Sequence, residues 1–388
     1  MKIGFFGGTF NPPHSGHMSA AAAAIKQLGL DKLFFIPTAV PPHKKLPDDS
    51  AAGIQRYEML KEACKDIPNS EALDIELRRG GESYTADTAR ELKAQYPEAE
   101  LWMLCGEDMF LTLEQWYRSD WIFKNVNIAV FARNDFAEKK LARHAAQLAS
   151  DKGASVELIK SEPVVISSTK LREMLKNGAG GEYLSDGVYS YILKNRLYGV
   201  RPQPDKLWKL VEPWIKEKRR DHVSGCRAEA VKLAVRWGAD VLDAENAAIL
   251  HDLTKGMDSN EQLILCEKYG KIIRNIDKDD FNVLHAFTGA EIAGALFGAS
   301  DEVCSAIRWH TTGKADMTLL EKIIWLADYI EPGRSFPGVE EVRRLAYTDI
   351  DEAMKLALGM SLDNLKNRGI KPYGATFDAL AFLADKGE

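Results

Sequence analysis

The sequence lacks the features of an exported, membrane-spanning or disulfide-bonded protein. Its 388 residues include 5 cysteines without CxxC spacing, each in an apolar stretch, which favours reduced core thiols. These are Cys64, Cys105, Cys226, Cys266 and Cys304. No apolar run approaches the roughly 18 residues of a membrane span, and the glycine-rich start is too short for a signal-peptide core. We therefore expect a cytoplasmic protein without a membrane partner.

The chain also has no excess of positive charge, no internal repeat and no low-complexity segment. Its formal net charge is -6, which argues against a nucleic-acid polymer as partner but leaves small nucleotides possible. A length of 388 residues exceeds what one hydrophobic core usually supports, so we expect two domains. The sequence leaves open whether the chain forms a homo-oligomer.

The first half alternates buried-strand and helix patterns. Residues 2–6 and 32–36 read as strands on either side of a helix over 16–28, which Gly29 ends, and this makes a βαβ unit. Further strands are expected at 100–105, 127–131 and 155–159, with helices at 86–95 and 141–150. The alternation predicts an α/β domain with a parallel, Rossmann-like sheet.

Strand patterns nearly vanish after the segment GVRPQPD, which follows Tyr198. We therefore expect a first domain over 1–198, a linker over 199–204 and an all-α second domain over 205–388. Its expected helices cover 205–220, 224–237, 243–253, 259–269, 285–296, 301–310, 317–330 and 349–367.

The segment GGTFNPPHSGH lies between the first strand and the first helix, where open α/β sheets bind ligands. Gly7 and Gly8 allow a phosphate to approach the backbone closely. His14 and His17 stand three apart at the helix start and can face the same anion beside the helix dipole. The arrangement suits a triphosphate; the alternative is a turn with two surface histidines.

This segment resembles the H-x-G-H signature of the nucleotidyltransferase superfamily. PPHK at 41–44, ESYTADTARELK from Glu82, GEDMFLTLEQWY from Gly106 and ISSTKLR at 166–172 are similar, in order and spacing, to bacterial nicotinate mononucleotide adenylyltransferases. The resemblance covers residues 1–198. It implies transfer of AMP from ATP, with Mg²⁺, to nicotinate mononucleotide, which gives deamido-NAD and pyrophosphate. Asn11, where the family often has Asp, and Asn134, where it often has Pro, depart from the pattern.

Adenylyl transfer needs no covalent enzyme intermediate, because the acceptor's phosphate can attack the α-phosphorus directly. The protein then mainly positions two anions and neutralises developing charge. By the resemblance, the residues sharing this work are His14, His17, Lys44 and Arg172. The implied substrate-binding residues are Gly7, Gly8, Thr9, Phe10, Thr85, Gly106, Asp108, Trp116, Tyr117, Arg133, Ser168 and Thr169.

Several of these residues have physical roles that can be stated beside the resemblance. Ser168 and Thr169 can cap a helix and donate to phosphate, and Asp108, after a strand, can accept from ribose hydroxyls. Trp116 offers a flat face for a pyridine ring, and Thr85 with the backbone near Tyr117 can donate to the nicotinate carboxylate. The alternatives are a plain loop carboxylate for Asp108 and a core position for Trp116.

Other acceptors are alternatives to nicotinate mononucleotide. Related enzymes act on nicotinamide mononucleotide, pantetheine phosphate or cytidylyl substrates. The segments SYTADT and LEQWY favour the nicotinate form.

Four of the eight histidines fall in the second half, in helical patterns, together with two aspartates. The six candidate metal ligands are His222, His251, Asp252, His285, His310 and Asp328. Side chains of adjacent helical residues point about 100° apart, so His251 and Asp252 need not bind identically. An aspartate can bridge two metals while histidines complete each shell.

The ordered segments RRDH, HDLTK, HAFTGA, HTTG and IIWLADYIEPGR resemble the HD phosphohydrolase domain over 205–388. They are most similar to the bacterial family that splits diadenosine tetraphosphate symmetrically into two ADP. The resemblance implies one metal held by His222, His251, Asp252 and Asp328, and a second held by Asp252, His285 and His310. The implied metal is iron or another transition ion, and Asp252 is central to catalysis.

Lys255 and Arg334 follow their motifs by about one helical turn and are candidate phosphate contacts; solvated surface charges are the alternative.

Two other readings of this half remain open. It acts on a different nucleotide, or it is a non-catalytic nucleotide sensor that regulates its partner domain.

Overall fold

The structure is a computed structural model that describes residues 1–42, 45–132, 135–161, 166–271 and 281–385. The chain forms two compact units. The first comprises residues 1–176, 180–192 and 197–199, and the second comprises 177–179, 193–196 and 200–388. Residues 177–199 therefore contribute short pieces to both units. Within the described ranges, no helix is both long enough and apolar enough to cross a membrane.

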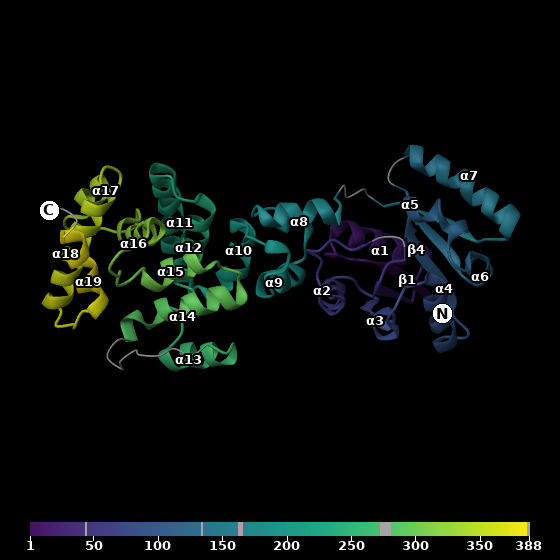
Figure 1. The fold of residues 1–388 in the computed structure, drawn as a ribbon, viewed down its shortest axis with the longest axis horizontal. Helices are drawn as coiled ribbons and strands as arrows, with labels where there is room; N and C mark the ends of the chain where they lie inside the picture. The colour runs from purple at the N-terminus through teal and green to yellow at the C-terminus, as the bar shows by residue number, and fades with distance from the viewer. Residues whose placement is uncertain (43–44, 133–134, 162–165, 272–280, 386–388) are drawn as a thin grey trace. The chain divides into compact units, whose positions relative to one another are not determined.

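The first unit is built on a parallel sheet, as the sequence predicts (Figure 1), and the sheet has six strands where five were expected. Its strand order is β3-β2-β1-β4-β5-β6. The strands are β1 (Lys2–Gly8), β2 (Lys32–Pro37), β3 (Ser70–Ala72), β4 (Glu100–Gly106), β5 (Asn127–Phe131) and β6 (Val156–Ile159). Only β3 was not expected, because three residues with one buried side chain are too few to show a strand period.

Helices cover both faces of this sheet. The helical elements of the first half are α1 (Ser15–Leu28), α2 (Gly53–Cys64), α3 (Ile75–Arg79), α4 (Thr85–Gln95), α5 (Glu107–Phe110), α6 (Ser119–Asn125), α7 (Asp135–Lys152), α8 (Ser168–Lys176) and α9 (Asp186–Lys194). Short 3₁₀ turns are η1 (Leu113–Gln115), η2 (Gly181–Tyr183) and η3 (Leu197–Gly199). One core joins the sheet to α1 and α2, and the other joins its opposite face to α4, α6 and α7.

Helix α1 illustrates how the sequence forms these layers. Its alanine-rich segment favours a helix, and the buried residues Ala21, Ala24 and Leu28 recur at helical spacing on one side. Gly29 ends the helix in a left-handed conformation with φ of 62°, which glycine adopts without a steric cost.

The strand order places the switch point of the sheet at β1 and β4. β1 lies between β2 and β4, so the chain winds outward in opposite directions from this pair. Such a switch point leaves a crevice outside the carboxyl ends of the two strands. Gly8 ends β1 and Gly106 ends β4, so the loops that carry the predicted substrate motifs both begin there.

The second unit is helical, as predicted. Its elements are α10 (Pro204–Val211), η4 (Glu212–Trp214), α11 (Glu217–Trp237), α12 (Val241–Leu250), α13 (Ser259–Lys268), α14 (Phe281–Leu296), α15 (Asp301–Trp309), α16 (Leu319–Ile330), α17 (Val339–Ala346), α18 (Ile350–Asn367) and α19 (Gly374–Asp385). Helices α11, α12, α14, α15 and α16 pack on one another, and α17, α18 and α19 pack in sequence beside α16 (Figure 1).

Two expectations about these helices were wrong. The break expected between the helices at 205–220 and 224–237 is absent, because α11 runs unbroken through His222. The helical segment is divided earlier, at Pro213, which cannot donate a helical hydrogen bond. His251, Asp252 and His310 lie just after the ends of α12 and α15 rather than inside helices. Helices α17 and α19 were not expected.

Candidate functional site

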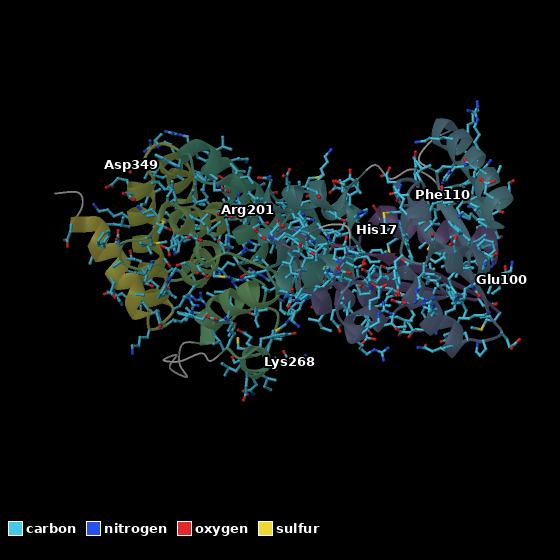
Figure 2. All side chains as sticks on the ribbon, turned by 45° about the vertical axis from the view of Figure 1, so that its right-hand side comes forward. His17, Glu100, Phe110, Arg201, Lys268 and Asp349 are labelled. Atoms are coloured by element: carbon cyan, nitrogen blue, oxygen red, sulfur yellow. The ribbon has the colours of Figure 1, made fainter. Side chains whose placement is uncertain are left out.

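The two predicted catalytic histidines lie at the start of α1. His14 precedes the helix, and His17, labelled in Figure 2, lies in its first turn with its ring centroid 3.8 Å from that of His14. The backbone N–H of His14 donates to Nδ1 of His17 at 3.3 Å, so His17 carries its own proton on Nε2. Burial lowers the pKa of His14 to about 4, and burial followed by the nearby His14 holds the pKa of His17 well below its usual value. Both imidazoles are therefore neutral near pH 7.

The loop before these histidines is held by Asn11, one of the two departures from the family pattern. Asn11 is 3% exposed, and its Nδ2 donates to Oγ of Ser50 at 2.9 Å. Its Oδ1 accepts from the Tyr198 hydroxyl at 2.9 Å and from the Ala51 backbone at 3.1 Å. An aspartate could not make the donation to Ser50, so the asparagine fits this network.

A buried arginine that the sequence did not single out fastens the same region. Arg56 of α2 is 1% exposed, and its guanidinium donates to three backbone carbonyls. Nη1 binds the carbonyl of Thr9 at 2.8 Å, Nη2 that of Thr38 at 2.7 Å, and Nε that of Ala51 at 3.3 Å. Arg56 thus joins the loops that follow β1 and β2 to the segment that precedes α2.

The start of α8 meets the loop that carries His14. Ser168 Oγ donates to the Pro12 carbonyl at 3.2 Å, and Arg172 Nη1 donates to the Asn11 carbonyl at 3.0 Å. Arg172 is 5% exposed, and its Nε lies 3.4 Å from Oδ1 of Asp49, so the guanidinium contacts both Asp49 and the loop that carries His14. Its role in neutralising phosphate charge stays a prediction. Ser167, rather than Ser168 or Thr169, caps α8 by accepting from the Lys170 backbone.

Aromatic side chains gather at the other predicted substrate segments. The rings of Tyr84 and Tyr117 lie 4.6 Å apart, and the Arg118 guanidinium lies 5.3 Å from the Tyr117 ring. Trp116 is half-buried beside the core and its Nε1 donates to Thr112, while Thr85 is half-buried at the start of α4. Tyr84 was not singled out from the sequence, although it belongs to the segment SYTADT.

The remaining predicted residues of this half have mixed placements. Gly7, Gly8, Thr9 and Gly106 lie at the carboxyl ends of β1 and β4, and Asp108 is exposed on α5. The Phe10 ring is buried among Phe6, His17 and Phe35, so only its backbone can face a ligand. The predictions for Lys44 and Arg133, and the departure at Asn134, lie outside the described residues.

The six predicted metal ligands of the second half lie together. Asp252 contacts ligand atoms on both sides, so the distances from its two oxygens divide the cluster into two groups. In the first group, His222 Nε2 lies 3.4 Å from His251 Nε2, 3.1 Å from Asp328 Oδ1 and 3.6 Å from Asp252 Oδ2. In the second, Asp252 Oδ1 lies 3.5 Å from His285 Nε2 and 3.8 Å from His310 Nε2. The two oxygens of Asp252 therefore face different groups.

Neighbouring groups orient the histidines. Nδ1 of His251 contacts the Ala248 carbonyl at 2.7 Å, and Nδ1 of His310 contacts the Ile307 carbonyl at 2.7 Å, so each Nδ1 carries a proton and each Nε2 is free to bind a cation. The buried carboxylate of Glu331 orients His222 in the same way, because its Oε1 lies 3.2 Å from Nδ1 of His222. Burial lowers the pKa of His310 to about 4.

Three cationic side chains contact the carboxylates of this cluster. Arg219 Nη2 contacts Asp252 Oδ2, Lys255 Nζ lies 3.3 Å from Asp252 Oδ1, and Arg334 Nη2 donates to Asp328 Oδ1 at 2.6 Å. Lys255 and Arg334 were predicted near phosphate, whereas Arg219 was not, although it belongs to the segment RRDH. Side chains of this length can contact both the carboxylates and a bound phosphate.

One cysteine also lies at the cluster. Cys226 is a free, buried thiol, as expected, and its Sγ packs beside the His222 ring, 3.8 Å from Nδ1 and 3.6 Å from Nε2. Burial, followed by the carboxylates of Asp328 and Asp252, holds the pKa of the thiol well above its usual value.

The two halves match two different families. Residues 5–174 match the cytidylyltransferase-like family, and residues 219–333 match the HD domain family. A probable nicotinate-nucleotide adenylyltransferase of Lachnoclostridium phytofermentans is 33% identical over 198 residues, which are 51% of this chain and 98% of that protein. One of Exiguobacterium sibiricum is 36% identical over 184 residues, 47% of this chain and 91% of that protein.

A crystal structure of a predicted HD superfamily hydrolase involved in NAD metabolism, from Clostridium acetobutylicum, is 31% identical. It covers 47% of this chain and 97% of its own, with a TM-score of 0.44. By the extent of the sequence matches, the chain belongs to the nicotinate-nucleotide adenylyltransferase family in its first half and carries an HD domain in its second.

Proposed function

We propose that the first unit transfers AMP from ATP, with Mg²⁺, to nicotinate mononucleotide, giving deamido-NAD and pyrophosphate. The observation that carries the proposal is the meeting of the starts of α1 and α8 beside the switch point of the sheet. Helix starts present backbone N–H groups and a positive dipole end to an anion. Nδ1 of His14 is buried there and has no hydrogen-bond partner among the described residues, as expected of a group that binds a ligand.

In this proposal, the histidines act as neutral donors. His17 offers its Nε2–H, which is most useful where negative charge grows on the transferring phosphate. Ser168 and Thr169 add hydroxyl donors from α8, while Asn11 and Arg56 hold the loop in place. Trp116 and the pair Tyr84 and Tyr117 supply flat faces for the pyridine ring, and Thr85 supplies a donor for its carboxylate.

Comparing two acceptors tests the substrate assignment. A pocket that donates to a carboxylate leaves donors unpaired against an amide, so nicotinate mononucleotide should have a kcat/KM at least about 100-fold above that of nicotinamide mononucleotide. Initial rates of pyrophosphate release with each acceptor measure this ratio. Equal values would refute the nicotinate assignment, and activity with only a pantetheine or cytidylyl substrate would refute the pyridine pocket.

We further propose that the HD domain hydrolyses diadenosine tetraphosphate to two ADP. The observation that carries this proposal is the convergence of six imidazole and carboxylate ligands with three cationic side chains. The ligand set fits iron or another transition ion. The two oxygens of Asp252 face different ligand groups, which also fits a carboxylate placed between two cations.

The chain's own residues would divide the work. His222, His251, Asp252 and Asp328 would hold one metal, and Asp252, His285 and His310 a second. The metals, when bound, supply Lewis acidity toward a phosphoanhydride. Arg219, Lys255 and Arg334 would bind the phosphate oxygens and orient the chain of phosphates.

Product analysis after metal removal and reloading tests this proposal. Chelation should abolish hydrolysis, iron or another transition ion should restore it, and ADP should be the main product. AMP plus ATP would show asymmetric cleavage and contradict the assignment. Tight binding of diadenosine tetraphosphate without turnover in the metal-loaded protein would instead support a nucleotide sensor.

A further inference from the structure

A buried network of hydroxyl and amide groups lies beside the second metal position, outside the six ligands assigned above. Thr254 belongs to the turn that follows α12 and carries His251 and Asp252, and it has no exposed surface. Its Oγ1 donates to the backbone carbonyl of His285 at 3.0 Å and lies 2.8 Å from Oγ1 of Thr288. The segment HDLTK therefore contacts, through its threonine, the residue of α14 that is expected to bind the second metal.

The network continues from α14 to α13. Thr288 follows His285 by three residues and is fully buried. Its Oγ1 lies 2.8 Å from both Thr254 Oγ1 and Gln262 Oε1, so its hydroxyl can donate to either. Gln262 of α13 is 5% exposed, and its Nε2 donates at 3.0 Å to the carbonyl of Met257, farther along the same turn. Hydrogen bonds therefore join the turn to two helices in the interior, where an unpaired polar group is costly.

His285 is held differently from the other three histidines of the cluster. Those histidines are oriented at Nδ1 by a carbonyl or a carboxylate. In the described part of the chain, the contact that reaches His285 from another element, outside the ligand set, is the Thr254 hydroxyl at its backbone carbonyl. Asp252, two residues before Thr254, has its Oδ1 3.5 Å from His285 Nε2. The hydrogen bond thus spans the same gap that a metal ion between Asp252 and His285 would span.

We propose that Thr254, supported by Thr288, is a positioning residue for the second metal position, because it holds His285 at the distance from Asp252 at which both can bind one ion. The proposal rests on the metal centre proposed for the HD domain. Groups that hold metal ligands in place commonly change the metal affinity about tenfold to 100-fold. Loss of the Thr254 hydroxyl should therefore weaken binding of the second ion. It should spare the first ion, whose ligands other than Asp252 lie on α11, on α16 and at the end of α12.

Titration of the metal-free, full-length protein with Mn²⁺, without nucleotide, tests the proposal independently of activity. Calorimetry of the unmutated protein should show two ions bound per chain. Thr254→Val keeps the shape of the side chain and removes its hydroxyl, so it should bind the second ion on the order of tenfold more weakly and the first ion unchanged. Thr254→Ser keeps the hydroxyl and should bind both ions. The matched control, Thr376→Val, replaces a buried threonine of α19 and should also bind both.

Electron paramagnetic resonance of the Mn²⁺-loaded protein gives a second readout. Two metal ions in one centre lie about 3.5–4 Å apart, close enough to couple magnetically, whereas a single Mn²⁺ gives a resolved hyperfine spectrum. The unmutated protein and Thr254→Ser should show the coupled spectrum, and Thr254→Val that of a single ion. Thr288→Val interrupts the network from the side of α14 and should behave like Thr254→Val, so the test does not depend on the folding of one variant.

The possible results distinguish this inference from the proposed centre. Unchanged affinity for the second ion in both valine variants would overturn the role of Thr254 and leave the six-ligand centre standing. Loss of both ions in both variants would show that the hydroxyls maintain the whole domain rather than the position of His285, and would also overturn it. An unmutated protein that binds one ion would refute the second position and this inference with it, and one that binds none would refute the proposed centre itself.

Discussion

At the scale of single residues, the neutral state of the two N-terminal histidines determines what they can do. His17→Ala should lower kcat for adenylyl transfer about 100- to 1,000-fold, because it removes a donor aimed at the transferring phosphate. The KM for ATP should change much less, since the helix starts still bind the phosphates. His144→Ala is the matched control; its ring packs on Phe110, and we expect near-normal kcat. Near-normal turnover of His17→Ala would show that its assigned role is wrong.

The lowered pKa of His14 makes a prediction about stability. In the unfolded chain His14 binds a proton near its ordinary pKa of 6.5, whereas in the fold it does so only near 4. Between these values the unfolded state holds more protons, so the free energy of unfolding decreases as the pH falls from 6.5 to 4, by about 3 kcal/mol in total. Above pH 6.5 this contribution is constant.

Urea unfolding of the full-length protein at pH 7.5 and pH 5.0 measures the effect. His14→Asn should lose less stability over this interval than the unmutated protein, because asparagine does not titrate. The same pH dependence in both proteins would mean that His14 is freely protonated in the fold.

At the scale of elements, Arg56 connects α2 to the loops after β1 and β2. Arg56→Leu leaves three backbone carbonyls without their charged donor, and we expect a loss of about 3 to 5 kcal/mol in the free energy of unfolding. Arg90→Leu is the matched control. Arg90 makes a surface ion pair at 3.4 Å with Asp87 and covers Trp121, so its loss should cost about 1 kcal/mol or less. Chemical denaturation of both variants compares them, and equal costs would contradict the anchoring role.

The elements also show what could be predicted from the sequence. Five strands, the parallel sheet and the helical second half follow from hydrophobic periods that extend over several turns or strand repeats. The sequence did not reveal Arg56, because its partners are backbone carbonyls of three loops that only the fold brings together.

In the candidate sites, too, residues within a sequence motif were predicted, whereas contacts between distant segments were not. The six candidate HD ligands could be named because each lies in a recognisable motif. Cys226 is buried and free as expected, but its sequence neighbours do not show that Asp328, from another helix, lies near it. The predicted ends of α12 and α15 lie beyond the observed ends at Leu250 and Trp309, because helix periodicity does not mark the residue at which a helix stops.

At the scale of the whole molecule, the described site residues of one proposed activity all lie in one compact unit, and those of the other activity all lie in the other unit. Those for adenylyl transfer, from Gly7 to Arg172, lie in the first unit, and those for hydrolysis, from Arg219 to Arg334, lie in the second. Each unit has enough residues for its own core. We therefore propose that the two activities are separable. The domain boundary expected at 198 changes in one respect, because residues 177–179 and 193–196 belong to the second unit.

Two overlapping fragments and two point variants test this separation. A fragment ending at Val200 keeps Tyr198, which binds Asn11, and should retain adenylyl transfer. A fragment starting at Asn177 keeps 177–179 and 193–196, where Arg196 donates to the Ala299 carbonyl at 3.2 Å, and should retain hydrolysis. In the full chain, Asp252→Ala should abolish only hydrolysis and His17→Ala only transfer. A folded N-terminal fragment without adenylyl transfer would show that the halves depend on one another, because its described site residues are all present and only the second unit has been removed.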